Sequence, residues 1–192
     1  MLTASGMPAA SGAEAASSAP ASAFDRPDRI SASDDLDGDG ISERYLLEDH
    51  TLTVTEGSQK LWISPAEYTI DYFALGDIDN DGTLNLVFSL WKTGSFGRNH
   101  PFWHTGSDES YKNHLFLYKL REDTFKQAWC SSDLDHPILS FEIRDINDDG
   151  ENELVTLEGE YIQIAGERFA ADPEGSKQTT KWKWGGWGFQ RL

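Results

Sequence analysis

Short runs of apolar residues, some alternating with polar residues and some continuous, recur along the chain between clusters of turn residues. The segment 51–63, TLTVTEGSQKLWI, alternates on both sides of Glu56–Gln59, and the segment 114–129, HLFLYKLREDTFKQAW, does the same around Arg121–Asp123. Alternation with a period of two places every second side chain on one face of a strand. Each segment therefore predicts a β-hairpin.

Four further apolar runs adjoin acidic segments. The runs 72–77 (YFALGD) and 139–145 (LSFEIRD) lead into such segments, and the runs 84–91 (LNLVFSLW) and 152–159 (NELVTLEG) follow them. They are short and rich in residues that favour strands. The sequence as a whole therefore predicts an all-β domain.

Residues 1–29 differ from the rest, because they are mostly Ala, Ser, Gly and Pro and offer little to bury. This composition predicts a disordered linker over 1–29, followed by one β-domain over 30–192. A secretory signal would have a basic start and an apolar segment, and this stretch has neither. We expect an extracytoplasmic protein whose export signal belongs to a longer precursor. The alternative is a disordered tail on a cytoplasmic protein.

The charge of the chain narrows the range of partners. Lys and Arg number 16 against 33 Asp and Glu, which gives a formal net charge of -17. Such a surface repels phosphate backbones, so we do not expect nucleic acid as a partner. No apolar run reaches the roughly 18 residues that cross a bilayer, so we expect no transmembrane segment.

A nine-residue pattern occurs three times, as DLDGDGISE, DIDNDGTLN and DINDDGENE. Each copy has an oxygen-bearing side chain at positions one, three and five, glycine at six, and Glu or Asn at nine. These residues are Asp35, Asp37, Asp39, Gly40 and Glu43; Asp77, Asp79, Asp81, Gly82 and Asn85; and Asp145, Asn147, Asp149, Gly150 and Glu153. A tight turn of this kind aims alternate side chains at one point, and oxygen donors without His or Cys favour calcium.

Two alternatives compete with this interpretation. Asp, Asn and Gly are ordinary turn residues, so one copy alone could be a solvated acidic turn, but three copies in the same register favour calcium. An EF-hand would end in a bidentate Glu at position twelve, where this chain has Leu46, Phe88 and Thr156, and would have a helix on each side. We therefore expect calcium to bind in a connection between strands.

The segment ALGDIDNDGTLNLVF resembles the FG-GAP or VCBS-type repeat of integrin-α-like β-propellers, and the resemblance covers about Asp35 to Leu192. It implies four-stranded propeller blades, in each of which a calcium-binding loop joins strands of the same blade. The resemblance implies up to three bound Ca2+, with side-chain ligands at positions one, three, five and nine. It also implies ligation by the backbone carbonyls at position seven, which belong to Ile41, Thr83 and Glu151. Two residues depart from the acidic pattern of the repeat, namely Asn147 and Asn85.

The number of copies leaves the architecture open. Propellers generally have four or more blades, whereas three loops supply about three. The copies are also unevenly spaced, because the second and third lie farther apart than the first and second. A small or incomplete propeller, a fragment of a longer one, and a compact β-domain that reuses the repeat are all compatible with this spacing.

An aromatic segment of loop composition, residues 91–114, is a candidate surface for a partner. With the C-terminal run KWKWGGWGF it supplies rings and polar groups that would suit a glycan or a peptide. The alternative is that these rings fill the core. Trp182 and Trp184 alternate as in a strand, so we expect at least one of them to face inward. The candidate ligand-binding residues are Trp91, Arg98, His100, Phe102, Trp103, His104 and Trp187.

These features together predict a calcium-stabilised binding or display domain that recognises a glycan or a protein. The chain contains no serine elbow, no phosphate loop and no metal-binding His motif. Its densest carboxylates fit calcium ligation better than an acid and base pair. A carbohydrate-active lyase or hydrolase on a propeller-like scaffold, and a purely structural module of a larger surface protein, are the alternatives.

Overall fold

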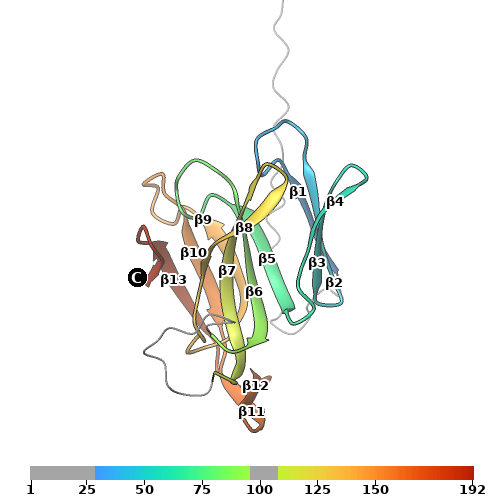
Figure 1. Cartoon of the computed structure of the whole chain (residues 1–192). Coiled ribbons are helices and arrows are strands. Elements are labelled where there is room, and N and C mark those ends of the chain that lie inside the picture. Colours follow the sequence, from blue (N-terminus) through green and yellow to red (C-terminus); the bar gives the residue numbers. More distant parts are fainter. Residues whose placement is uncertain (1–28, 96–107) are drawn as a thin grey trace, which may run out of the picture.

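The computed structural model describes residues 29–95 and 108–192, which form fourteen β-strands and no helix (Figure 1). The prediction of an all-β domain is therefore confirmed. The described part of the chain has no helix that could cross a membrane. The first strand begins at Arg29, so the remainder of the predicted linker lies outside the described residues.

The first sheet is an antiparallel meander of four consecutive strands, β1 (Arg29–Asp34), β2 (Glu43–Glu48), β3 (Thr51–Glu56) and β4 (Gln59–Ile63). Strands β3 and β4 are the hairpin predicted from the alternating segment 51–63, and they turn where the sequence indicates.

The second sheet begins with the same arrangement, in β5 (Thr69–Gly76), β6 (Asn85–Thr93), β7 (Tyr111–Arg121) and β8 (Thr124–Cys130). Strands β7 and β8 are the second predicted hairpin. The third sheet consists of β9, β10, β13 and β14, again antiparallel and again a meander. Its strands span Ile138–Arg144, Glu153–Glu158, Gln178–Trp184 and Phe189–Arg191.

Between β10 and β13 the chain leaves the third sheet and contributes a hairpin to the second. This hairpin consists of β11 (Tyr161–Ala165) and β12 (Arg168–Ala171). It joins the edge of β7 through a parallel pairing of Arg168 with Tyr111. The second sheet therefore has six strands, whereas the other two have four.

The strands β6 and β7 extend into the segment 91–114, which the composition assigned to a loop. Trp91 pairs with Asn113 and Thr93 pairs with Tyr111, so the ladder continues past the predicted end of the strands. The rings of Trp91 and Tyr111 stack with their centroids 6.0 Å apart, and this contact favours the extended pairing.

The three sheets stack in chain order, with the second between the first and the third (Figure 1). One apolar core fills each interface. Strand β6 serves both, because Phe88 and its alternate neighbours face the first sheet whereas Val87 faces the third. A strand that is covered on both faces has apolar residues at nearly every position, which explains the sequence LNLVFSLW.

Each acidic segment connects the first two strands of its own sheet, namely β1 to β2, β5 to β6, and β9 to β10. Strands therefore flank all three segments, as expected, and the EF-hand alternative is excluded. Among the described residues, the first and third sheets make no substantial contact with each other, so the stack is open and not closed into a ring.

Candidate metal centre

The three acidic segments, called here loop 1 (residues 35–43), loop 2 (77–85) and loop 3 (145–153), have the same backbone conformation. In each loop the residues at positions four and six have positive φ angles. Glycine adopts this left-handed region without a steric penalty, which explains why it stands at position six in all three loops. The φ angle is 93° at Gly40, 84° at Gly82 and 86° at Gly150.

Backbone amides inside each loop hold the acidic side chains. The aspartate at position one accepts a hydrogen bond from the N–H of the glycine at six, over 2.9 Å in loop 1, 2.8 Å in loop 2 and 2.7 Å in loop 3. The aspartate at position five accepts one from the N–H at position seven, which belongs to Ile41, Thr83 or Glu151. The chain thus curls around its own carboxylates, as local Asx hydrogen bonds favour.

The residue at position nine is fully buried in every loop and closes it. Glu43, Asn85 and Glu153 each have 0% exposure. One side-chain oxygen of each accepts a hydrogen bond from the backbone N–H at position two, over 2.8 Å, 3.0 Å and 3.1 Å respectively. Position nine therefore ties the start of the loop to the strand that follows it.

The second polar atom at position nine differs between the loops. Oε1 of Glu43 and Oε1 of Glu153 are buried and have no hydrogen-bond partner, and the same holds for Nδ2 of Asn85. A buried polar atom without a partner costs on the order of 1–3 kcal/mol. In loops 1 and 3 this atom is a carboxylate oxygen, which is a natural ligand for a hard cation.

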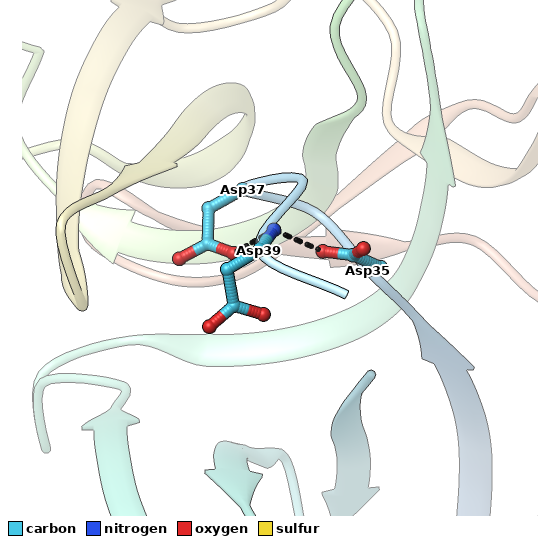
Figure 2. Close-up of side chains that lie close together, drawn as sticks. All are labelled: Asp35, Asp37 and Asp39. Atoms are coloured by element: carbon cyan, nitrogen blue, oxygen red, sulfur yellow. Dashed lines mark hydrogen bonds between the residues drawn. The ribbon is translucent and has the colours of Figure 1, made fainter. Parts of the chain in front are cut away.

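The aspartates of loop 1 are close enough together to hold a metal ion. One carboxylate oxygen from each of Asp35, Asp37 and Asp39 lies within 4.8 Å of the others, and Figure 2 shows the three side chains around the same turn. Burial raises the pKa of Glu43, and the nearby Asp37 carboxylate adds to the increase. Within the described ranges, no Lys, Arg or His forms an ion pair with any of these four carboxylates. Loop 1 thus collects negative charge that no ion pair within residues 29–95 and 108–192 neutralises.

Loop 2 contains an equally tight triplet, Asp77, Asp79 and Asp81, but a lysine lies against it. Nζ of Lys119 is 2.7 Å from Oδ2 of Asp79 and 2.5 Å from Oδ2 of Asp81. Hydrogen bonds from Lys119 and then from Thr83 lower the pKa of Asp81 to about 2. The protein therefore supplies a positive charge to loop 2 from its own sheet.

Loop 3 is intermediate between the other two in how far nearby groups offset its negative charge. Asn147 stands at position three, and its amide Nδ2 donates a hydrogen bond to Oδ2 of Asp149 over 3.1 Å. Lys183 approaches from β13, with Nζ 2.8 Å from the side chain of Glu151 and 3.5 Å from that of Asp149. The side chain of Lys183 remains 34% exposed, so it lies beside the loop and not inside it.

Loops 2 and 3 touch each other through a pair of amides. The side chain of Asn80 accepts a hydrogen bond from the backbone N–H of Asn152 over 2.7 Å and donates one to its carbonyl over 3.2 Å. Nδ2 of Asn152 donates to the carbonyl of Asp77 over 2.9 Å. These bonds join the second and third sheets at the end of the molecule where the loops lie.

A groove of about 620 Å³ runs between loop 1, loop 2 and the turn of the β7–β8 hairpin. Its charged lining residues are Asp37, Asp39, Glu122 and Asp123, together with the cationic Lys119 and Arg121. The groove opens loop 1 to solvent, so a cation can reach it without any rearrangement of the sheets.

The aromatic candidates do not form one surface within the described residues. Trp91 is only 7% exposed in β6, and its indole N–H donates to Oδ2 of Asp71 over 2.6 Å. Trp187 is 80% exposed in the turn between β13 and β14, on a different sheet. Trp182 and Trp184 both pack against the core between the second and third sheets, as the alternation indicated. The remaining candidates, Arg98, His100, Phe102, Trp103 and His104, lie outside the described residues.

No protein family, no curated protein and no solved structure matches this chain. The three loops and their immediate neighbours are therefore the basis on which a function can be proposed.

Proposed function

We propose that this chain is a calcium-stabilised β-domain of the FG-GAP or VCBS type, which acts outside the cytoplasm in binding or display. The observation that carries this proposal is the carboxylate of Glu43, whose Oε1 is buried without a partner beside three clustered aspartates. A bound Ca2+ would be coordinated by that oxygen and by Asp35, Asp37 and Asp39, together with the carbonyl oxygen of Ile41 that the sequence motif implies.

The physical role of the ion follows from the charge of the loop. Four carboxylates without a counter-ion repel one another, and an ion that binds only the folded state stabilises that state by mass action. The connection between β1 and β2 would then be fixed by the metal, because side chains from both ends of the loop contribute ligands. Calcium acts here as a structural ion, so the proposed function needs no catalytic group.

The sheets themselves support the blade interpretation. Each is, or contains, a meander of four antiparallel strands with an acidic loop between its first and second strands. This is the order of elements that the resemblance implies for a propeller blade. We propose that each meander is a blade-like unit, and that the three units are stacked openly around two apolar cores.

A glycan or a protein is the partner class that we propose for the domain. Trp187 supports it, because an indole that is 80% exposed offers an apolar face to a ligand. The net charge of -17 favours a neutral or basic partner over a polyanion.

Thermal unfolding in calcium, in chelator and in magnesium tests the stabilising role. At a free calcium concentration about 100 times the Kd, binding contributes about 2.7 kcal/mol, and each kcal/mol shifts the Tm of a chain this size by about 2–4 °C. We expect the Tm to fall by roughly 5–10 °C in EDTA and to recover with calcium but poorly with magnesium, which needs a smaller octahedral site. A Tm that is the same in EDTA and in calcium would contradict the proposal.

A further inference from the structure

The three loops have the same backbone but differ in one residue that comes from outside the loop. This residue lies on the third strand of each meander, opposite position nine. In the first sheet, Glu43 pairs directly with Glu56. In the second, Leu86 pairs with Tyr118, so the next residue, Lys119, lies beside Asn85. In the third, Leu154 pairs with Trp182, and the same step places Lys183 beside Glu153. The residue opposite position nine is therefore Glu56 in the first sheet, Lys119 in the second and Lys183 in the third.

Lys119 fills this place with an ammonium group that reaches into loop 2. Its side chain is only 11% exposed, and the carboxylate of Asp79 that it contacts is exposed to the same extent. Its Nζ is 2.7 Å from Oδ2 of Asp79 and 2.5 Å from Oδ2 of Asp81. The lysine therefore contacts two of the three carboxylates that a metal would need.

Asn85 leaves loop 2 without a free oxygen ligand for a metal at position nine. Its Oδ1 accepts hydrogen bonds from the backbone N–H groups of Ile78 and Asp79, over 3.0 Å and 3.4 Å. These donors fix the orientation of the amide, so the atom left without a partner is Nδ2. An amide N–H is a donor and cannot coordinate a cation. Loops 1 and 3, by contrast, leave a carboxylate oxygen at this position.

Loop 1 has a further carboxylate beside it where loop 2 has a lysine. Glu56 adds a fifth carboxylate to those of Asp35, Asp37, Asp39 and Glu43, and its Oε2 is buried without a hydrogen-bond partner. Asp123, in the turn of the β7–β8 hairpin, lines the same groove as Asp37 and Asp39. No lysine or arginine of the described ranges forms an ion pair with Glu56, in contrast to the lysines at the equivalent position in the other two sheets.

We propose that Lys119 is a built-in cation that takes the place of calcium in loop 2, whereas loop 1 is completed by an ion from solution. This proposal rests on the proposed function for loop 1 but makes a separate claim about loop 2. Loop 2 is folded in the absence of metal, because Lys119 offsets part of the charge of its three aspartates. Loop 1 is the calcium-dependent element. Loop 3 keeps its ligand oxygen on Glu153 and binds calcium in competition with Lys183.

Calcium stoichiometry and melting temperature, measured on matched variants of the whole chain, test the proposal. Asp37→Ala in loop 1 and Asp79→Ala in loop 2 remove the side-chain oxygens at the equivalent position three. We expect Asp37→Ala to remove one bound calcium per chain and Asp79→Ala to leave the stoichiometry unchanged. Loss of one bound calcium in Asp79→Ala, in a variant whose circular dichroism is native, would overturn the proposal.

The variant Lys119→Gln provides the second arm, with Lys119→Arg as its charge-preserving control. Without the ammonium group, the three aspartates of loop 2 repel one another. We expect Lys119→Gln to melt at a lower temperature than the wild type in EDTA, whereas Lys119→Arg should melt like the wild type. A Lys119→Gln protein that melts like the wild type in EDTA would overturn the proposal.

The two arms separate this inference from the proposed function. If the wild type binds no calcium, the proposed function fails. The built-in cation still stands if Lys119→Gln melts at a lower temperature in EDTA and Lys119→Arg does not.

Discussion

Glu43 and Glu56 are directly opposite each other on the neighbouring strands β2 and β3, and each has a carboxylate oxygen that is buried without a hydrogen-bond partner. Two like charges directly opposite each other destabilise a sheet. A cation between or beside the two groups would remove this repulsion, as would protonation of one of them. The pair is therefore a place where the proposed calcium binding can be tested directly.

Neutralising one member of the pair should change the stability of the metal-free protein and its calcium affinity in opposite directions. We expect Glu56→Gln to raise the Tm in EDTA, because it removes a repulsion, and to weaken calcium binding, because it removes a negative charge beside loop 1. Thermal melts and calorimetric titrations of the same preparation measure both effects. A Glu56→Gln protein that is less stable than the wild type in EDTA would contradict this account of the pair.

The amide contact between loops 2 and 3 should stabilise the stack without affecting the metal. Asn152→Ala removes the side-chain hydrogen bond to the carbonyl of Asp77 and keeps the two bonds between the Asn80 side chain and the backbone of residue 152. The loss of one such hydrogen bond costs about 1 kcal/mol. We expect a lower Tm with an unchanged calcium affinity of loop 1, and the exposed substitution Thr179→Ala should change neither. An Asn152→Ala protein with the wild-type Tm would show that the contact is dispensable.

A buried histidine should make the domain less stable in mild acid. His114 is fully buried, and burial followed by the nearby charge of Lys92 lowers its pKa from 6.5 to about 4, although Asp133 lies 3.4 Å away. Because the pKa in the folded state is below that in the unfolded state, the stability from neutral His114 is fully present above pH 6.5 and is lost as the pH falls toward about 4.

Melts in EDTA at a series of pH values measure this effect without the contribution of calcium. We expect the Tm to decline across this interval in the wild type and to decline less in His114→Gln, with His50→Gln as a control at a more exposed position. Equal pH dependence in His114→Gln and the wild type would remove His114 as the cause.

The two tryptophans of the C-terminal run should respond in opposite ways to truncation. Trp182 packs against the second core, and its indole N–H donates to Oγ1 of Thr180 over 2.8 Å, so Trp182→Ala should cost about 3–5 kcal/mol. Trp187 is exposed, so Trp187→Ala should leave the Tm nearly unchanged and should weaken binding to a glycan or protein partner. A large loss of stability in Trp187→Ala would show that the ring is structural.

The hairpins and the turns of the acidic loops could be predicted from the sequence, because both depend on residues that are close together in the chain. Alternation over 51–63 and 114–129 is sufficient for the hairpins, and the spacing of Asp and Gly is sufficient for the turns. The sequence also predicted that strands and not helices flank the loops, because the runs that follow them are short and rich in strand-forming residues.

The roles of Lys119, Lys183 and Glu56 could not be predicted in this way. They depend on which residue of the third strand lies beside position nine, and this register is fixed by a connection of a different length in each sheet. The sequence left open whether Trp91 lies in the core or at a surface, for a related reason, since its partners Asp71 and Tyr111 come from neighbouring strands. The hairpin β11–β12 leaves its own sheet for another, and no local pattern marks that exchange.

Calorimetric titration of the chelator-treated wild type and of Glu43→Gln with calcium tests the central claim most directly. Glu43→Gln keeps a side-chain oxygen that can accept the hydrogen bond from Leu36, but it replaces the unpartnered carboxylate oxygen with an amide. We predict a saturable binding isotherm for the wild type and the loss of one bound calcium in Glu43→Gln. The absence of any calcium binding by the wild type, or an identical stoichiometry in Glu43→Gln, would contradict the assignment of loop 1 as a calcium site.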